Sequence, residues 1–422
     1  MINQIKKVGV IGAGTMGAGI AGQVANAGID VWLLDLPSDG EDVNMLSGKG
    51  LERLKDPDMP GLMSKEAENL INLGNTRDHF HELADCDWIA EAVVERLDIK
   101  QSLYKKLNDS CKKSTIITSN TSTIPIKLLT EGMPIEFCER FAITHFFNPV
   151  RFMRLLELVR GEFTRDDVIS TLHEFSEIKL GKGVVPCSDT PGFLANRVGV
   201  FAIQCALHNA FELGLSPTEA DAFFGRPLGL PKTGVFGLYD LIGIDLMADV
   251  VRSLVSILPE DDAFHKYSAP IDFMTKMIAN GQTGNKNDKG FYKQDGDGKK
   301  VINLSNGDYV PHERLKAPLL EIAEKNGVSE ILNDNGPYGL YIWRVLSETL
   351  CYAASLVPEV TEDLTQIDDA MKLGYNWIKG PFELLDEIGA EGFINRLKDD
   401  GRDVPSFLQK SLPKKFYTAL ES

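Results

Sequence analysis

The stretch Val8-Gly-Val-Ile-Gly-Ala-Gly-Thr-Met-Gly17 joins a short apolar run to a segment rich in Ala and Gly. Gly12, Gly14 and Gly17 follow the spacing G-x-G-x-x-G. In this pattern the first glycine permits a tight turn, the second lets the backbone approach a pyrophosphate, and the third lets helix and strand pack closely. The N-terminus of the following helix adds N–H donors and the positive end of a dipole. The stretch therefore predicts a strand–turn–helix unit that binds a dinucleotide.

The end of the second apolar run carries Asp35, roughly twenty residues past the glycines. A carboxylate at this place accepts hydrogen bonds from an adenosine ribose and repels a 2′-phosphate. Leu36 and Pro37 follow it and provide no arginine for such a phosphate. The sequence therefore favours NAD over NADP as cofactor. The alternative is a glycine-rich packing turn without a cofactor, which the combination of strand, helix and acid makes the weaker interpretation.

Short apolar runs alternate with helical patterns in the N-terminal part of the chain, as in a parallel sheet with crossover helices. The runs are Val8–Ile11, Val31–Leu34, Trp88–Val94, Thr115–Thr118, Phe141–Thr144 and Leu155–Val159. The segment from Pro37 to Arg77 is too long for a simple loop, and we expect helices in it. From Asp189-Thr-Pro191, a predicted helix start, the strand pattern mostly ends. We predict a Rossmann-type parallel-sheet α/β domain (1–187), followed by two related all-α domains.

The two predicted helical domains, 188–295 and 334–422, are separated by a linker (296–333) with a short hairpin. The second domain reads as a degenerate repeat of the first. Arg197 corresponds to Arg344 and Asp221 to Asp368, while Gly234–Asp240 corresponds to Gly380–Asp386 in the same order. Because order and spacing both persist, an internal duplication explains these matches better than chance similarity between two helical hairpins.

The charge balance limits the kinds of partner. Lys and Arg total 44 against 61 Asp and Glu, a formal net charge of −17. Broad contact with nucleic acid or an anionic membrane is therefore not expected, although local cations can still hold an anionic small molecule. The six cysteines are scattered, without metal-ligand spacing, so we expect reduced thiols and no metal. Residues 1–7 lack the apolar core of a signal peptide, and we expect a cytoplasmic protein.

Two polar residues in apolar surroundings suggest chemistry. His145 follows the run Phe141–Thr144, at the carboxyl end of a strand, where open parallel sheets bind ligands. Glu157 lies within Leu155–Val159, where an unpaired carboxylate would be costly, and an imidazole from the preceding strand is its natural partner. Such a pair suits hydride transfer from an alcohol, with His as base and Glu fixing its tautomer. A core histidine and an edge-strand charge are the alternative interpretation.

Several ordered motifs resemble the L-3-hydroxyacyl-CoA dehydrogenase family. They are Gly12-Ala-Gly-Thr-Met-Gly17, Glu91-Ala-Val-Val-Glu95, Ser119-Asn-Thr-Ser122, His145-Phe-Phe-Asn-Pro149, Leu156-Glu-Leu-Val159, Asp189-Thr-Pro-Gly-Phe193 and Asn196-Arg197. The resemblance runs from about Lys7 to Tyr292. The second helical block is similar to the extra copy in multifunctional fatty-acid β-oxidation proteins, although no enoyl-CoA hydratase domain is recognisable in this sequence.

The resemblance implies NAD-dependent oxidation of (3S)-3-hydroxyacyl-CoA to 3-ketoacyl-CoA in β-oxidation. His145 would be the base and Glu157 its orienting partner, while Asn196 and Ser122 would contact the reacting end of the acyl-CoA. The residues implied at the cofactor are Gly12, Gly14, Met16, Gly17, Asp35, Glu95, Lys100, Asn120, Ser122 and Asn148. A related dehydrogenase of a small hydroxy acid or sugar acid, or a catalytically silent NAD-binding structural protein, is the alternative function.

The second helical block has Trp343 where the first has Asn196. In shorter relatives one helical block per chain mediates dimerisation, as the resemblance implies. We therefore expect the second block to pack on the first as a pseudo-dimer within a monomeric chain. The resemblance also allows association with a hydratase domain or with other β-oxidation enzymes.

Overall fold

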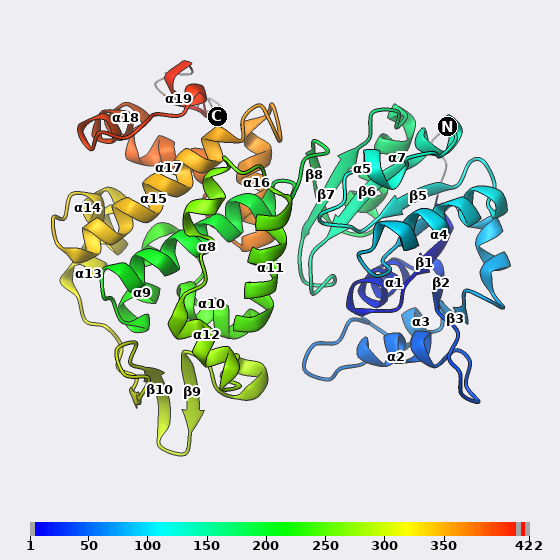
Figure 1. Ribbon diagram of the computed structural model, residues 1–422, viewed down its shortest axis with the longest axis horizontal. Coiled ribbons are helices and arrows are strands. Elements are labelled where there is room, and N and C mark those ends of the chain that lie inside the picture. The colour runs from blue at the N-terminus through cyan, green and yellow to red at the C-terminus, as the bar shows by residue number, and fades with distance from the viewer. Residues whose placement is uncertain (1–4, 411–414, 418–422) are drawn as a thin grey trace. The chain divides into compact units, whose positions relative to one another are not determined.

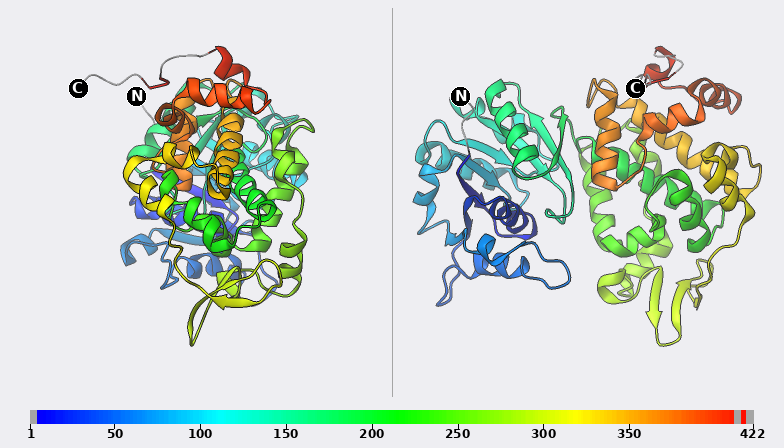
Figure 2. Two further views of the ribbon diagram at one scale, coloured as in Figure 1. Left: turned by 90° about the vertical axis from the view of Figure 1, so that its left-hand side faces the viewer. Right: turned by 180° about the vertical axis from the view of Figure 1, so that it is seen from behind.

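The computed structural model describes residues 5–410 and 415–417, and the predicted domain limits at residues 1 and 422 lie outside them. The chain forms two compact units, which divide between Phe193 and Leu194 (Figure 1). The first holds the sheet and the second is mostly helical, as the two further views also show (Figure 2). The α/β fold followed by helical parts is thus confirmed, while the finer four-part division stays a prediction.

An eight-stranded sheet is the centre of the first unit, in the order β3-β2-β1-β4-β5-β6-β7-β8. Its neighbouring strands run parallel except for the antiparallel pair of β6 and β7. The strands are β1 (Lys7–Ile11), β2 (Asp30–Asp35), β3 (Ile71–Asn75), β4 (Trp88–Glu91), β5 (Ile116–Ser119), β6 (Phe141–Phe146), β7 (Leu155–Arg160) and β8 (Gly183–Cys187).

Helices cover this sheet, with α1 packed on β1 and β2, and α7 packed on β7 and β8. Apolar side chains of α1 and of the central strands form the core, in which Val10, Ile20 and Leu33 are fully buried. The helices are α1 (Thr15–Asn26), α2 (Met45–Arg53), α3 (Lys65–Glu68), the 3₁₀ turn η1 (Phe80–Asp85), α4 (Leu97–Ser110), α5 (Ile126–Leu129), α6 (Ile135–Cys138) and α7 (Asp166–Ile178).

The structure corrects several details of the prediction. The segment from Pro37 to Arg77 holds the helices we expected, but also the strand β3, and β8 was missed as well. The sheet is not wholly parallel, because the short connection between β6 and β7 leaves no room for a crossover helix. β4 ends at Glu91, before Val94. His145 lies within β6, which continues to Phe146, and not beyond its end.

The predicted helix start at Asp189 is also wrong. Helix α8 begins at Ala195, and the Asp189 carboxylate instead accepts the N–H of Ile126 at the start of α5 (2.9 Å to Oδ2). An Asp-Thr-Pro sequence is typical of an N-cap, but the carboxylate caps a helix that lies elsewhere in the chain.

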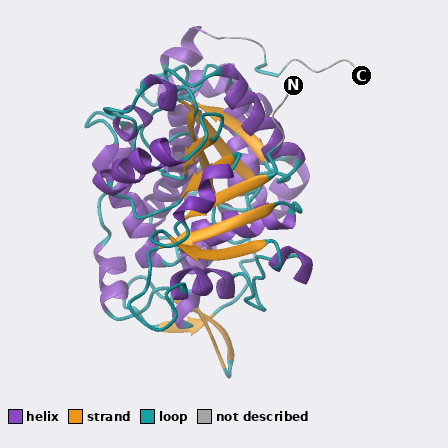
Figure 3. Cartoon of the chain, turned by 90° about the vertical axis from the view of Figure 1, so that its right-hand side faces the viewer, coloured by secondary structure: helices purple, strands orange, loops and turns teal. Residues whose placement is uncertain are grey.

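The second unit is helical apart from a three-stranded antiparallel sheet (Figure 3). That sheet contains the predicted hairpin, in β9 (Tyr292–Asp295) and β10 (Gly298–Ile302), with β11 (Tyr309–Pro311) beside it. The helical elements are α8 (Ala195–Glu212), α9 (Pro217–Phe223), η2 (Arg226–Leu228), α10 (Gly234–Ile242), α11 (Ile244–Ile257), η3 (Ala263–Tyr267), α12 (Asp272–Ala279), η4 (Asn285–Asn287), α13 (Pro318–Asn326), α14 (Val328–Leu332), α15 (Pro337–Ser355), α16 (Leu364–Tyr375), α17 (Pro381–Ile388), α18 (Ala390–Asp399) and α19 (Ser406–Lys410).

Aspartates of the two predicted copies make matching sets of hydrogen bonds. In the first copy, Asp221 accepts the N–H groups of Phe236 (2.7 Å) and Gly237 (3.0 Å) at the start of α10. It also accepts the Tyr292 hydroxyl (2.8 Å). The backbone N–H of Tyr292 in turn donates to Asp240 (2.7 Å). The two carboxylates therefore fasten α9, α10 and the start of β9 to one another.

The second copy repeats these bonds with its own residues. Asp368 accepts the N–H groups of Phe382 (2.9 Å) and Glu383 (3.0 Å) at the start of α17. It also accepts the Tyr417 hydroxyl (2.7 Å), and the N–H of Tyr417 donates to Asp386 (2.8 Å). The same carboxylates thus perform the same task in both halves of the unit, as expected of a duplicated scaffold.

The two copies pack through α8 and α15, which lie side by side (Figure 1). Arg197 of the first copy donates to Glu359 of the second (2.7 Å), and the equivalent Arg344 donates to Glu212 of the first (2.7 Å). Because each arginine reaches the glutamate of the other copy, the contact is reciprocal, as in an isologous twofold interface. Among the described residues, no helix is long and apolar enough to span a bilayer.

Candidate active site

His145 and Glu157 occupy one register position of the antiparallel β6–β7 pair. Nδ1 of His145 lies 2.7 Å from Oε2 of Glu157. Glu157 is fully buried and His145 is 6% exposed. Because carboxylate oxygens accept hydrogen bonds, this contact favours the tautomer in which Nδ1 carries the proton and Nε2 is an acceptor. The structure thus brings together the two residues that the sequence suggested as a pair.

Apolar rings and a fixed backbone surround this pair. The rings of Phe147 and Phe193 lie 4.6 and 5.6 Å from the imidazole, centroid to centroid. Asn120, at the end of β5, accepts the N–H of Phe146 (2.9 Å) and so ties β5 to the end of β6. Asn148 follows in the turn after β6. The imidazole therefore sits in a restricted and largely water-free position.

Lys182 holds the turn that follows Asn148. Its buried ammonium donates to the carbonyl oxygens of Val150 and Met153, the latter at 2.8 Å. Burial lowers the pKa of Lys182 to about 8. A buried cation on backbone carbonyls fixes the chain between β6 and β7, and the sequence analysis gave this residue no role.

The glycine-rich turn has the geometry that a dinucleotide requires. Gly12 has a φ of +98°, and a Cβ there would lie 2.4 Å from the carbonyl oxygen of Ala92. A Cβ on Gly17 would lie 1.7 Å from the carbonyl oxygen of Gly12. By contrast, nothing lies within 4 Å of a Cβ on Gly14, which is exposed before the first turn of α1. That open space, beside free helix N–H groups, fits a pyrophosphate.

Asp35 lies directly against this turn. Its Oδ2 accepts the N–H of Ala13 (2.6 Å) and its Oδ1 accepts the N–H of Leu36 (2.6 Å). On the other side, the Arg53 guanidinium of α2 donates to the carbonyl oxygen of Ala13 (2.9 Å). The acid that the sequence assigned to an adenosine ribose is therefore at the glycine turn.

Lys100 and Glu95 belong to a network centred on the buried carboxylate of Glu91. Lys100 is 1% exposed, and its ammonium lies 2.6 Å from Glu91 and 3.1 Å from Glu95. Glu91 also accepts the hydroxyls of Tyr104 (2.5 Å) and Ser119 (2.7 Å). Burial and the Glu91 charge raise the pKa of Tyr104 well above its ordinary value.

Glu95 is the exposed end of this network, with 40% of its side chain accessible. Thr121 and Thr123 donate their hydroxyls to it, Thr123 at 2.8 Å. Burial opposes its ionisation, but the Lys100 charge and these hydroxyls outweigh it and lower the pKa of Glu95. The sequence motif that contains Glu91 predicted no role for it. Like Glu157, however, Glu91 is a carboxylate inside an apolar strand, and this feature could have marked it as a residue with a buried partner.

The remaining predicted residues divide between the two units. Met16 and Ser122 are half-buried in the first unit, near the glycine turn and after β5 respectively. Asn196 lies in the second unit, on α8, where it accepts the hydroxyl of Tyr375 from the second copy (3.4 Å). Trp343 takes its place in that copy and donates to Asp400 (2.6 Å). Within the described ranges, no cluster of three or more His, Cys, Asp or Glu suits a metal ion.

Two family models match most of the chain. Residues 7–190 match the 3-hydroxyacyl-CoA dehydrogenase NAD binding domain. Residues 192–294 and 339–418 match the 3-hydroxyacyl-CoA dehydrogenase C-terminal domain, whose two segments coincide with the two helical copies. The first model also indicates NAD as the cofactor, in agreement with the sequence prediction.

Relatives agree with these models. A protein of Rickettsia prowazekii named "Putative fatty acid oxidation complex trifunctional enzyme" is 40% identical over 100% of this chain and 58% of its own length. A Bacillus subtilis protein named "Probable 3-hydroxyacyl-CoA dehydrogenase" is 33% identical over 98% of this chain and 55% of its own. The chain thus spans little more than half the length of these relatives. The crystal structure of 3-hydroxybutyryl-CoA dehydrogenase from Escherichia coli K12 has a TM-score of 0.70 at 25% identity, covering 96% of this chain and 98% of that one.

Proposed function

This chain belongs to the 3-hydroxyacyl-CoA dehydrogenase family, and from that premise we propose that it oxidises (3S)-3-hydroxyacyl-CoA to 3-ketoacyl-CoA with NAD in fatty-acid β-oxidation. The observation that carries the proposal is the buried His145–Glu157 pair, 2.7 Å apart, in the same unit as a glycine turn with an open pyrophosphate position. A base oriented by a carboxylate, near a nicotinamide, is the machinery that alcohol oxidation needs.

In this mechanism His145 is the general base. With Nδ1–H donated to Glu157, its Nε2 accepts the proton of the substrate 3-hydroxyl. The Glu157 charge stabilises the imidazolium that forms, and its hydrogen bond to Nδ1 keeps the ring from turning. Bound NAD supplies the acceptor for the hydride. Proton return through the same Nε2 allows the reverse reduction.

The cofactor residues follow the geometry of the turn. We assign the pyrophosphate to the loop of Gly12, Gly14 and Gly17 and the adenosine ribose to Asp35. Glu95, held by Lys100, would bind the nicotinamide ribose side, while Lys100 itself is too buried to do more than position it. We also assign Met16, Asn120, Ser122 and Asn148 to the cofactor site.

On the substrate side, we assign the reacting end of the acyl-CoA to Ser122 and Asn196. Asn196 receives a hydrogen bond from Tyr375 of the second helical copy. The absence of an equivalent amide in that copy, where Trp343 stands, supports a packing role for it. The chain would then be a monomeric pseudo-dimer.

Two further proposals concern the protein partners of the chain and its location in the cell. The relative named for a fatty acid oxidation complex supports association with other β-oxidation activities, including a hydratase. Cys86, Cys111, Cys138, Cys205 and Cys351 are free thiols, which supports a cytoplasmic, reducing location. Co-purification with a hydratase activity tests the first, and fractionation of cell extract tests the second.

The reaction is tested by following NADH absorbance with acetoacetyl-CoA and, separately, with free 3-keto acids. We expect turnover with acetoacetyl-CoA and little with the free acids. A higher kcat/KM for a free hydroxy or keto acid would favour the small-acid dehydrogenase. Tight NADH binding without turnover on any of these would favour a silent NAD-binding structural protein.

A further inference from the structure

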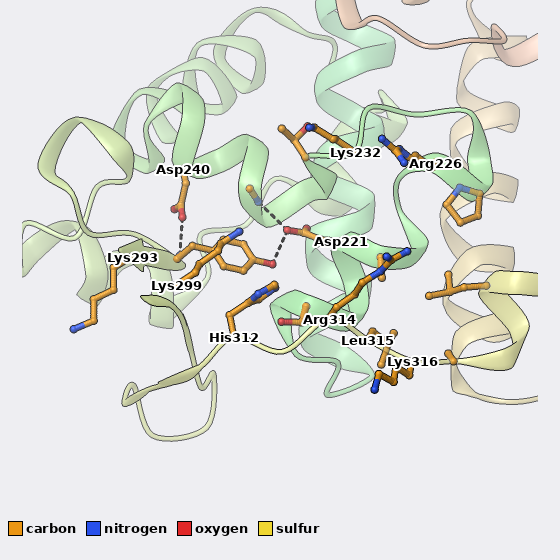
Figure 4. A pocket seen from close by; sticks show the side chains of 18 of the residues that line it. Asp221, Arg226, Lys232, Asp240, Lys293, Lys299, His312, Arg314, Leu315 and Lys316 are labelled. Atoms are coloured by element: carbon orange, nitrogen blue, oxygen red, sulfur yellow. Dashed lines mark hydrogen bonds between the residues drawn. The ribbon is translucent and has the colours of Figure 1, made fainter. Parts of the chain in front are cut away.

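The second unit contains a cavity that the proposed dehydrogenase reaction does not use. It has a volume of about 1280 Å³, and η2, α10, the β9–β10 hairpin and the segment before α13 line it (Figure 4). All of its lining residues lie in the helical unit. A cavity of this size accommodates a ligand as large as a nucleotide.

Positive charge gathers on the walls of this cavity although the chain as a whole carries −17. The basic residues of the wall are Arg226, Lys232, Lys293, Lys299, Arg314 and Lys316. Lys293 lies 3.7 Å from Asp295 and points away from the others (Figure 4). The other five make no ion pair with any residue that the structure describes. Unneutralised cations around one concave space attract an anion.

Four carboxylates also line the cavity. Asp221 and Asp240 accept hydrogen bonds from backbone N–H groups, and Asp221 also accepts the Tyr292 hydroxyl. Asp288 and Glu321 are exposed and form no ion pair with the basic residues of the wall. Burial raises the pKa of Asp221 to about 7 and, against the pull of Lys299, that of Asp240 to about 6. The same bonds fix α9, α10 and β9, so the cavity walls are set before any ligand binds.

The duplicated scaffold provides an internal comparison. In the second copy, Lys372 pairs with Glu383 (2.9 Å) and Lys379 pairs with Glu387 (2.8 Å). The corresponding stretch of the first copy carries Arg226 and Lys232 without acidic partners. The second copy has the same fold and pairs its lysines with glutamates, so the fold does not require unpaired cations at this place. Their presence points to a ligand.

We propose that this cavity binds a small molecule carrying at least two phosphate groups, at a site separate from the cofactor. A terminal phosphate brings close to two negative charges and a bridged one brings a single charge, and arginine forks match the acceptor oxygens of both. Arg226, Lys232 and Arg314 all line the cavity (Figure 4), so a chain of phosphates can satisfy several of them together. Free nucleotides and the pyrophosphate end of coenzyme A both carry this chemistry.

Calorimetric titration of the full chain, with NADH saturating the cofactor site, tests the proposal. The probes are inorganic pyrophosphate, ADP, ATP and free coenzyme A, each at low ionic strength. We expect binding of pyrophosphate and of ADP or ATP, weakened by added salt. Selective binding of coenzyme A over the nucleotides, lost in the cavity variant, would identify coenzyme A as the source of the phosphates.

The cavity variant is Arg226→Gln/Lys232→Gln/Arg314→Gln, at three exposed side chains. Its control is Lys105→Gln/Lys106→Gln/Lys113→Gln, which removes the same charge from the exposed surface of the first unit. The cavity variant should lose about tenfold or more in affinity for pyrophosphate, and the control should lose little. NADH affinity and thermal midpoint should stay at the wild-type values in both.

Three results would overturn the proposal: no binding of any probe by the wild type, equal losses in both variants, or coenzyme A binding that the cavity variant leaves intact. The last would place coenzyme A only at the dehydrogenase substrate site. Binding of an RNA oligonucleotide or of phosphatidylserine vesicles more tightly than of any small phosphate, through the same three residues, would replace the small ligand with a macromolecule.

Discussion

His145 and Glu157 face each other across β6 and β7, with 2.7 Å between Nδ1 and Oε2, and both side chains are buried. The pair forms because β7 follows β6 after a short connection and runs antiparallel to it. This pairing places His145 and Glu157 at the same register position. In the proposed mechanism, proton acceptance by His145 would therefore depend on the Glu157 carboxylate.

We expect His145→Gln to lower kcat for acetoacetyl-CoA reduction by about 10²–10⁴, the usual share of a general base. Glu157→Gln should approach the same loss, because a neutral amide presents its own N–H to Nδ1 and no longer stabilises the imidazolium. Stopped-flow NADH oxidation gives kcat, and NADH fluorescence gives an affinity that should be unchanged. If the losses of the two single variants multiply in the double variant, the two residues do not act as one unit.

Gly14 and Gly17 should respond differently to alanine. Gly14→Ala adds a methyl group with nothing within 4 Å, so the chain should fold normally but lose affinity for NADH, where the methyl group meets the pyrophosphate. Gly17→Ala places a Cβ 1.7 Å from the Gly12 carbonyl oxygen and should lower the thermal midpoint as well. Wild-type NADH affinity in folded Gly14→Ala would contradict the pyrophosphate assignment.

The central strands of the first unit and the contact between His145 and Glu157 could be predicted because each carries its signal locally. β1 and β2 are continuous apolar runs, buried on both faces. The two missed strands, β3 and β8, are the outer strands of the sheet. β3 includes Asn72, Gly74 and Asn75, and β8 includes Pro186, residues that an edge strand tolerates and that hide it from pattern reading.

Contacts between distant parts of the chain were not readable. Glu91 and Glu157 carry the same signal, a carboxylate in an apolar strand, but only the second had an obvious histidine partner nearby in sequence. The partners of Glu91 come from α4 and β5. Likewise, nothing in the sequence near Asp35 indicated that Arg53 would reach the same glycine turn. Such pairings depend on packing, which no local pattern encodes.

Cofactor preference should change at Asp35. We expect Asp35→Ser to weaken NADH about tenfold or more, because two charge-assisted bonds to the ribose are lost, and to admit NADPH, since the repulsive charge is gone. The Arg53 guanidinium, already at Ala13, would then meet the 2′-phosphate. Kd values for NADH and NADPH, from fluorescence, measure both effects. Arg53→Met in the Asp35→Ser background should abolish the gain, and an unaffected NADPH affinity would remove Arg53 from this role.

The pH dependence of stability should report on Asp221. Burial raises its pKa from 3.8 to about 7 in the folded chain. The folded state therefore binds more protons than the unfolded state between these values, so the Asp221 contribution is full below pH 3.8 and is lost as pH rises through about 7. The urea midpoint of Asp221→Asn should consequently fall less between pH 5 and pH 8 than that of the wild type.

The exposed Asp288→Asn is the matched control for that experiment, and its urea midpoints should follow the wild type at every pH. Asp368, whose pKa burial raises to about 6, gives a second test in the other copy: Asp368→Asn should flatten the profile over a narrower range. Equal slopes for wild type and Asp221→Asn would show that this carboxyl does not titrate differently on unfolding.

Substitution of the two arginines at the contact between the copies should lower the free energy of unfolding by very different amounts. Arg197 is 2% exposed and also pairs with Asp262, itself 4% exposed, whereas Arg344 is 35% exposed. Removing Arg197 leaves the buried Asp262 carboxylate without a counter-charge and costs about 3–5 kcal/mol. Removing the exposed one should cost less than about 1 kcal/mol. Urea denaturation of Arg197→Met and Arg344→Met measures the two free energies of unfolding.

The same samples test whether the second copy replaces a dimer partner. Because α15 covers the face of α8 within one chain, light scattering of the wild type should give a mass near 46.6 kDa. Arg197→Met weakens the contact between the two copies and should expose the face of α8 that α15 covers. Two chains could then pair through this face, so we expect a concentration-dependent dimer in that variant alone. A wild-type dimer that Arg197→Met dissociates would reverse the argument, because Arg197 would then hold two chains together instead of two halves of one.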